Sequence, residues 1–239
     1  ASLVQKAIMA MLRLCQRLLP YKTDISEPLM RGIQLVSLVD EQVASDMAST
    51  IAAEVLNLLK GAAPYIQHQP VWVSICGLLK IIQYDPASFP VCVETVGWVV
   101  REALTPLNFA IVLPTVVDLM ERAVPDARRG EGRTGYPQHV PDLLGLLLSS
   151  EEWLELWWLG MARSPRASEP QWVSFKHDAW YQVVSMLCRV INNANLEVRS
   201  AAVGFLQRSV VAAEKLAIGV EQVQQSLLML VLPMTHDLV

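Results

Sequence analysis

The chain has 239 residues, 53% of them hydrophobic and 18% charged, which is long and apolar enough for a soluble globular protein with a large core. Its formal net charge of -4 argues against nucleic-acid binding, because contacts with the phosphate backbone need a concentrated excess of Lys and Arg. Any contact with a membrane must therefore be local.

Apolar residues recur at helical spacing along most of the chain. Over residues 3–19, Ile8, Leu12 and Cys15 fall on one face, whereas polar residues such as Lys6 take the opposite one. The same pattern predicts further helices over residues 26–38, 41–60, 70–83, 87–103, 106–124, 141–163, 178–193, 196–214 and 219–232. No stretch of the sequence has the alternating pattern of a strand.

Polar residues and prolines mark the helix boundaries. Thr105 is a predicted N-cap with Pro106 at the first helical position, and Asn195 is predicted to cap the helix that begins at Leu196. Short turns between helices favour consecutive antiparallel pairs, repeating about every 40 residues. We therefore expect an all-α fold, a right-handed α-solenoid of antiparallel helix pairs of the HEAT or armadillo-like kind.

We expect residues 1–239 to form a single helical-repeat domain with two interruptions. Residues 125–140 are rich in Gly and Pro and predict a flexible loop, and residues 164–171 predict a shorter one. The longest uncharged stretch, residues 61–79, contains two prolines, which predicts a turn and not a transmembrane helix. The first residues already lie in helical register and resemble no signal peptide, as expected of a piece of a longer protein.

The cysteines and histidines do not form a recognisable metal or redox motif. The cysteines stand alone on apolar helical stretches, which predicts buried free thiols in a reducing compartment. The histidines lack metal-ligand spacing and are interpreted as structural or solvated. These residues are Cys15, Cys76, Cys92 and Cys188, and His68, His139, His177 and His236. We expect no cofactor and no metal ion.

No motif for a nucleophile elbow or a phosphate-binding loop is present, so catalysis has little support. Glu151, Glu152 and Glu155 are the densest carboxylates, but they alternate with large apolar residues on a predicted helix. General acid and base catalysis needs a desolvated carboxylate in a cleft. We interpret these three residues as a solvated acidic edge.

Three tryptophans on the same helix are candidates for a contact surface. Trp153 and Trp157 form an i, i+4 pair, whereas Trp158 is rotated by about 100° from its neighbour. Packing in the core is the favoured interpretation, because neighbouring repeats cover solenoid helices on both flanks. The alternative is contact with a partner helix or a membrane interface, where Trp is enriched.

The loop over residues 125–140 carries Arg128, Arg129 and Arg133, whose guanidinium groups match the geometry of phosphate. This makes it a candidate for contact with a phosphoinositide or an acidic protein. Asp126 and Glu131 offset most of that charge, so a solvated loop is the favoured interpretation.

Three stretches resemble one protein family in sequence and in order. They are residues 4–8 running into 12–19, then Glu94-Thr95-Val96 with Val99-Val100-Arg101 and residues 105–109, and last Val198-Arg199 with residues 205–208. Together they resemble the region downstream of the catalytic domain in Golgi-type large Arf guanine-nucleotide exchange factors, the GBF, Gea and GNOM class.

The resemblance implies a noncatalytic regulatory and membrane-targeting segment, cytoplasmic and peripherally associated with Golgi membranes. Its implied partners are small GTPases of the Arf or Rab type and other domains of the parent exchange factor. Relatives often carry a long polar insertion at residues 125–140, and their catalytic domain has no counterpart here, so no catalytic residue is transferred. Because dimerisation in the family is attributed to upstream regions, we expect a monomer.

Two other interpretations remain open. The chain can be a HEAT-repeat scaffold of an unrelated trafficking or transport complex, because shared helix-packing constraints generate similar short stretches. A hydrolase or metal enzyme would instead require polar side chains from distant helices to converge in the interior.

Overall fold

The computed structural model describes residues 3–124, 135–162, 169–193 and 196–237. These residues form helices and turns, and no strand occurs among them, so the predicted all-α class is confirmed. The chain divides into two compact units, Ala1–Leu119 and Met120–Val239. The prediction of one continuous domain over residues 1–239 remains a prediction.

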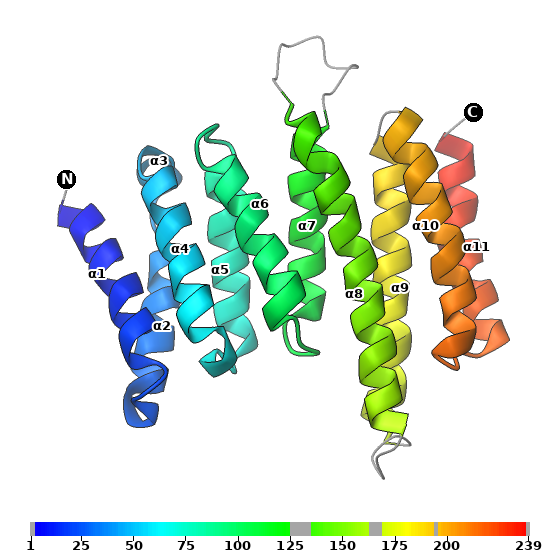
Figure 1. The fold of residues 1–239 in the computed structure, drawn as a ribbon, viewed down its shortest axis with the longest axis horizontal. Coiled ribbons are helices and arrows are strands. Elements are labelled where there is room, and N and C mark those ends of the chain that lie inside the picture. Colours follow the sequence, from blue (N-terminus) through cyan, green and yellow to red (C-terminus); the bar gives the residue numbers. More distant parts are fainter. Residues whose placement is uncertain (1–2, 125–134, 163–168, 194–195, 238–239) are drawn as a thin grey trace. The chain divides into compact units, whose positions relative to one another are not determined.

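Unit 1 consists of helices in two layers (Figure 1). One layer holds α1, α4 and α6, the other holds α2 and α5, and α1 and α4 each pack across the layers as well. The elements are α1 Leu3–Leu18, η1 Thr23–Ile25, α2 Ser26–Val36, α3 Glu41–Asp46, α4 Ala48–Ala62, η2 Ala63–Tyr65, α5 Gln69–Ile82, α6 Phe89–Trp98 and the π-helical η3 Val99–Ala103. Helix α7, Phe109–Ala123, runs past the boundary of the unit.

The core of unit 1 forms where the apolar stripes of these helices meet. Leu12 of α1, Ile33 of α2, Ile51 and Leu58 of α4 and Ile75 of α5 are at most 1% exposed. Burial of apolar side chains of this size stabilises a fold by about 1.5–3 kcal/mol each. Helix pairing therefore supplies the main stabilising term.

Unit 2 repeats the arrangement with longer helices (Figure 1). Its elements are η4 Pro137–His139, α8 Val140–Ala162, α9 Pro170–Asn193, α10 Leu196–Lys215 and α11 Val220–Asp237. Helix α9 packs against α8, α10 and α11, and α8 also packs against α10. Trp180 of α9 is fully buried and donates its indole N–H to the carbonyl of Ser209, 2.8 Å away.

Several predicted boundaries were wrong. The helix predicted over residues 41–60 is divided at Met47, whose backbone (φ -114°, ψ 9°) leaves the helical region. Helix α9 begins at Pro170 and not at residue 178. A proline is tolerated in the first turn, and the contacts of Trp172 and Phe175 with other aromatic rings supply tertiary support there.

The helix predicted to begin at Pro106 begins at Phe109, and residues 106–108 form a turn in which the carbonyl of Thr105 accepts from the N–H of Phe109 at 3.0 Å. The capping side chain is that of Asn108, however, whose Oδ1 accepts from the N–H of Thr105 at 2.8 Å. The predicted cap Asn195 lies outside the described residues. Within the ranges that the structure covers, no helix combines the length and the apolar composition needed to cross a bilayer.

We expect Trp72→Ala and Trp180→Ala to destabilise units 1 and 2, respectively, by about 3–5 kcal/mol. Each indole is at most 2% exposed and donates its N–H to a backbone carbonyl, so truncation creates a cavity and leaves that carbonyl unpaired. Urea unfolding followed by circular dichroism measures the loss. The control is Tyr21→Ala, which is expected to change stability by less than about 0.5 kcal/mol because Tyr21 is 82% exposed.

Candidate functional site

The structure places the three candidate tryptophans on α8, each of them partly exposed. Trp153 and Trp157 lie side by side, with ring centroids 6.0 Å apart, as their spacing predicts. Trp158 points to another side of the helix and lies under Lys176. The other candidates, Arg128, Arg129 and Arg133, lie outside the described residues.

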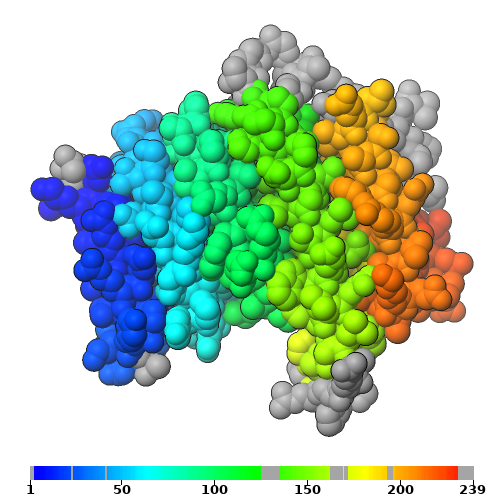
Figure 2. Space-filling model, in the orientation of Figure 1, coloured from blue at the N-terminus to red at the C-terminus, as the bar shows by residue number. Residues whose placement is uncertain are grey.

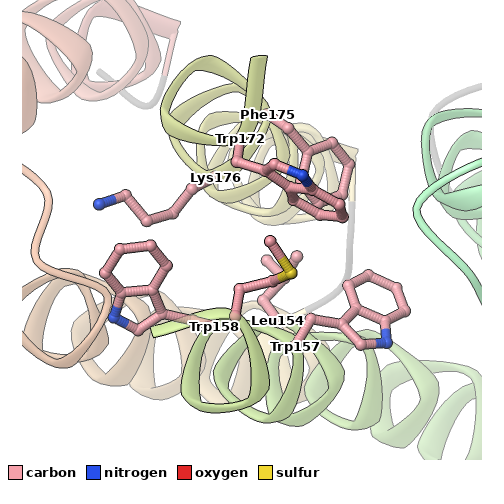
Figure 3. Close-up of a pocket in the computed structure, with 7 residues that line it drawn as sticks. Leu154, Trp157, Trp158, Trp172, Phe175 and Lys176 are labelled. Carbon is pink, nitrogen blue, oxygen red and sulfur yellow. The ribbon is translucent and has the colours of Figure 1, made fainter. Parts of the chain in front are cut away.

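A half-open pocket lies between α8 and α9 in unit 2, and we call it the aromatic pocket (Figure 3). Its empty space is about 280 Å³, including the open mouth. The lining residues are Leu154, Trp157, Trp158 and Met161 of α8 and Trp172, Phe175 and Lys176 of α9. Apolar side chains thus dominate the lining, and Lys176 alone among these residues carries a charge.

Aromatic rings from the two helices hold the pocket open. Phe175 lies 6.2 Å from Trp157 and 5.8 Å from Trp172, in an edge-on arrangement with Trp172. Tilted and edge-on pairs are the favoured geometries for aromatic rings, and they limit rearrangement of the walls. Figure 3 shows Trp158 and Lys176 on one side of the pocket and Trp172, Phe175 and Trp157 on the other.

The α9 side of the pocket was missed in the sequence. Trp172, Phe175 and Lys176 fall before residue 178, where the helix was predicted to begin. The signal was present, because Trp172, Phe175 and Ala179 are spaced by i, i+3 and i+7, as on one face of a helix. The preceding Pro170 marked the start of that helix.

Lys176 links three elements of unit 2. Its Nζ lies 4.0 Å from the centroid of the Trp158 ring and donates to the carbonyl oxygen of Ala217 at 2.9 Å. Burial lowers the pKa of Lys176 from its ordinary value. In the part of the chain that the structure covers, no carboxylate forms an ion pair with it.

Ala217 closes α10 in a Schellman motif. The N–H of Ile218 donates to the carbonyl of Ala213 at 3.0 Å, and that of Ala217 donates to Glu214 at 2.9 Å. Ala217 has a φ of 50°, a conformation that usually belongs to glycine. Lys176 therefore binds the one described non-glycine residue that has a positive φ.

The interpretation of Glu151 as part of a solvated edge was wrong. Its exposed fraction is 7%, and its Oε1 accepts no hydrogen bond from any described residue. Burial raises the pKa of Glu151 most strongly and Glu155 adds to the rise, whereas Ser209, Arg208 and Lys215 on α10 oppose it. Glu152 is exposed as predicted, and Glu155 forms an ion pair with Lys215 at 2.9 Å.

The four cysteines are buried free thiols, as predicted. Burial raises the pKa of Cys15, Cys76 and Cys188 to about 11 and that of Cys92 to about 12. Among the described residues, no group of three or more His, Cys, Asp or Glu side chains is placed to hold a metal ion.

We expect the thiols of the folded chain to react very slowly with Ellman's reagent at pH 8, because all four are buried and protonated at that pH. Unfolding in guanidinium chloride should release four reactive thiols per chain. Absorbance at about 412 nm measures both states. Rapid reaction of one thiol in the folded chain would contradict the burial of that cysteine.

We expect Glu151→Gln to raise the free energy of unfolding at pH 7 by about 1 kcal/mol, because it removes a buried charge and keeps the shape of the side chain. A carboxyl pKa raised above 4.5 in the folded state also means that protonation favours folding. The wild-type chain should therefore gain stability relative to Glu151→Gln as the pH falls from 7 towards 4.5.

Urea unfolding at pH 7 and at pH 5 measures both effects. Glu152→Gln is the matched control, since it removes an exposed carboxylate from the adjacent position. A loss of stability in Glu151→Gln at pH 7 would show that the charged form is stabilising.

Comparison with known proteins finds that the sequence of this helical chain is similar to one family. Residues 180–239 match the family model described as GBF1-like, tetratrico peptide repeat region. The chain is 31% identical over 214 residues to the ARF guanine-nucleotide exchange factor GNOM of Arabidopsis thaliana, and 27% identical over 218 residues to the ARF guanine-nucleotide exchange factor GNL1 of the same plant. These alignments cover 87% and 89% of the chain, respectively, but only 14% of each relative.

No solved structure matches the chain significantly. The two relatives and the family model nevertheless agree with the resemblance found in the sequence, which is thereby confirmed. The chain is similar to a segment of the large ARF guanine-nucleotide exchange factors.

Proposed function

We propose that the chain is a noncatalytic regulatory and membrane-targeting segment of an Arf guanine-nucleotide exchange factor that acts in Golgi vesicle traffic. In this role it presents a helical surface to small GTPases of the Arf or Rab type or to other parts of the parent protein. It works in the cytoplasm, peripherally associated with Golgi membranes. The similarity to GNOM and GNL1 carries the assignment to an exchange factor, and the aromatic pocket between α8 and α9 supports the contact surface.

The chemistry of the pocket supports binding and not catalysis. Its lining offers aromatic and aliphatic surface with one ammonium group, and it brings no pair of titratable side chains together for proton transfer. Partly exposed Trp side chains combine a large apolar ring with an N–H donor, which is why they are enriched in protein interfaces. The proposal leaves nucleotide exchange to other parts of the exchange factor, and the chain spans 14% of each relative's length.

Further apolar side chains on the same two helices are open to solvent. Leu156 and Leu159 of α8 are 58% and 60% exposed, and Val173 of α9 is 44% exposed. Figure 2 shows α8, in light green, open along the face in view. By helical spacing Leu156 and Leu159 lie on a different side of α8 from Leu154 and Trp158, so they add exposed apolar surface to the helix and not to the pocket.

We expect the 239-residue chain to bind at least one GTP-loaded Arf or Rab protein or liposomes of Golgi-like lipid composition. The double variant Trp157→Ser/Trp158→Ser should weaken that binding at least about tenfold, because Trp side chains in contact sites carry a large share of the binding energy. Surface plasmon resonance and liposome flotation measure the two kinds of binding. GDP-loaded GTPases test nucleotide dependence.

Tyr21→Ser is the matched control, because it removes an exposed aromatic ring from unit 1 and should leave binding unchanged. Circular dichroism verifies that each variant is folded. Absence of binding to every GTPase and to liposomes would leave only a role as an internal scaffold and would contradict the proposal.

A further inference from the structure

The aromatic pocket has two chemically different sides. Trp157, Trp172 and Phe175 form an apolar side, and Lys176 stands on the opposite side above Trp158 (Figure 3). An apolar cavity with a single charge at its rim orients a ligand, because the apolar part enters and an opposite charge stays at the rim.

The ammonium group of Lys176 has capacity left for an anion. It carries three N–H donors, of which one is used by the carbonyl of Ala217 and the Trp158 ring covers another direction. Its partners, a carbonyl and an aromatic face, leave the positive charge uncompensated, and no described carboxylate lies within ion-pair distance. A partly buried charge without a counter-ion favours a ligand that supplies one.

The pocket is shallow and open. Most of its empty space of about 280 Å³ lies in the open mouth, so a side chain that packs there lies against the aromatic walls, and a small molecule would not be enclosed. We propose that the aromatic pocket takes one large apolar side chain of a protein segment and that a carboxylate of the same segment binds Lys176 Nζ. This inference rests on the proposed function and names the chemistry of its partner.

The surroundings of the pocket favour a protein segment over an anionic membrane. Glu152 and Asp178 are exposed on the two helices that form the pocket, but each lies two residues from a pocket residue and therefore on another side of its helix, so neither adds charge at the pocket itself. The nearby Lys215 is already paired with Glu155. Convincing anionic-lipid sites gather roughly four to eight basic residues, whereas Lys176 is a single charge suited to a single carboxylate.

The test compares two peptides that differ in one group, acetyl-Glu-Leu-Trp-amide and acetyl-Gln-Leu-Trp-amide. Both carry the same apolar side chains, and the first alone carries a carboxylate. Titration of the 15N-labelled chain, followed through the indole N–H signals, measures both affinities. We expect the Glu peptide to bind about threefold or more tightly than the Gln peptide.

Substitutions of Lys176 test whether its ammonium group causes the preference for the Glu peptide. Lys176→Met keeps the alkyl stem and should bind both peptides equally, whereas Lys176→Arg should retain the preference for Glu. Lys22→Met is the matched control, because Lys22 is an exposed lysine of unit 1. If Lys176→Met proves unstable, the peptide pair on the wild-type chain and Lys176→Arg still decide the question.

Equal affinities of the wild-type chain for the two peptides would overturn the inference, as would an unchanged preference in Lys176→Met. Vesicles of phosphatidylcholine with phosphatidylserine form a separate arm. Binding to these vesicles that depends on Lys176, without binding to either peptide, would assign the pocket to lipid and overturn the proposal. A Glu preference in a chain that binds no Arf or Rab protein and no liposome would instead uphold the pocket chemistry and contradict the proposed function.

Discussion

The apolar stripe of each helix has to be covered by another helix. Each unit is therefore organised around a central helix of its own, which packs against several neighbours. In unit 1 this is α4, which packs against α1, α5 and α6 and buries Ile51, Val55 and Leu58. In unit 2 it is α9, which packs against α8, α10 and α11 and buries Trp180 and Val184. The site exists because α8 and α9 leave this mutual coverage incomplete at one place.

Helix periodicity made most of the fold predictable from the sequence. A stripe such as Ile8, Leu12 and Cys15 determines which residues are buried without any knowledge of the partner helix. The start of α9 is marked in the sequence by Pro170 and by the helical spacing of Trp172 and Phe175. The break at Met47 is not predictable from periodicity, because it depends on the packing of α3 against α5, which is distant in the chain. The burial of Glu151 is of the same kind, since α10 covers it.

The candidate site was half visible in the sequence. The sequence points to Trp153, Trp157 and Trp158, whose intermediate burial bears out packing in the core only in part, and their contact with a partner remains a proposal. Their rings pack against neighbouring aromatic side chains while part of their surface remains open. The role of Lys176 could not be predicted from the sequence, because its position over Trp158 depends on the packing of α8 against α9.

The bond from Lys176 to Ala217 gives the pocket a link to the corner between α10 and α11. An alanine in the left-handed region costs about 1 kcal/mol, and the bond to its carbonyl helps to hold it there. A ligand that draws the ammonium group of Lys176 away from Ala217 breaks this hydrogen bond. A ligand that binds the ammonium group while the bond is kept stabilises the conformation of Ala217. By thermodynamic reciprocity, the conformation of the corner and the affinity of the pocket influence each other to the same extent.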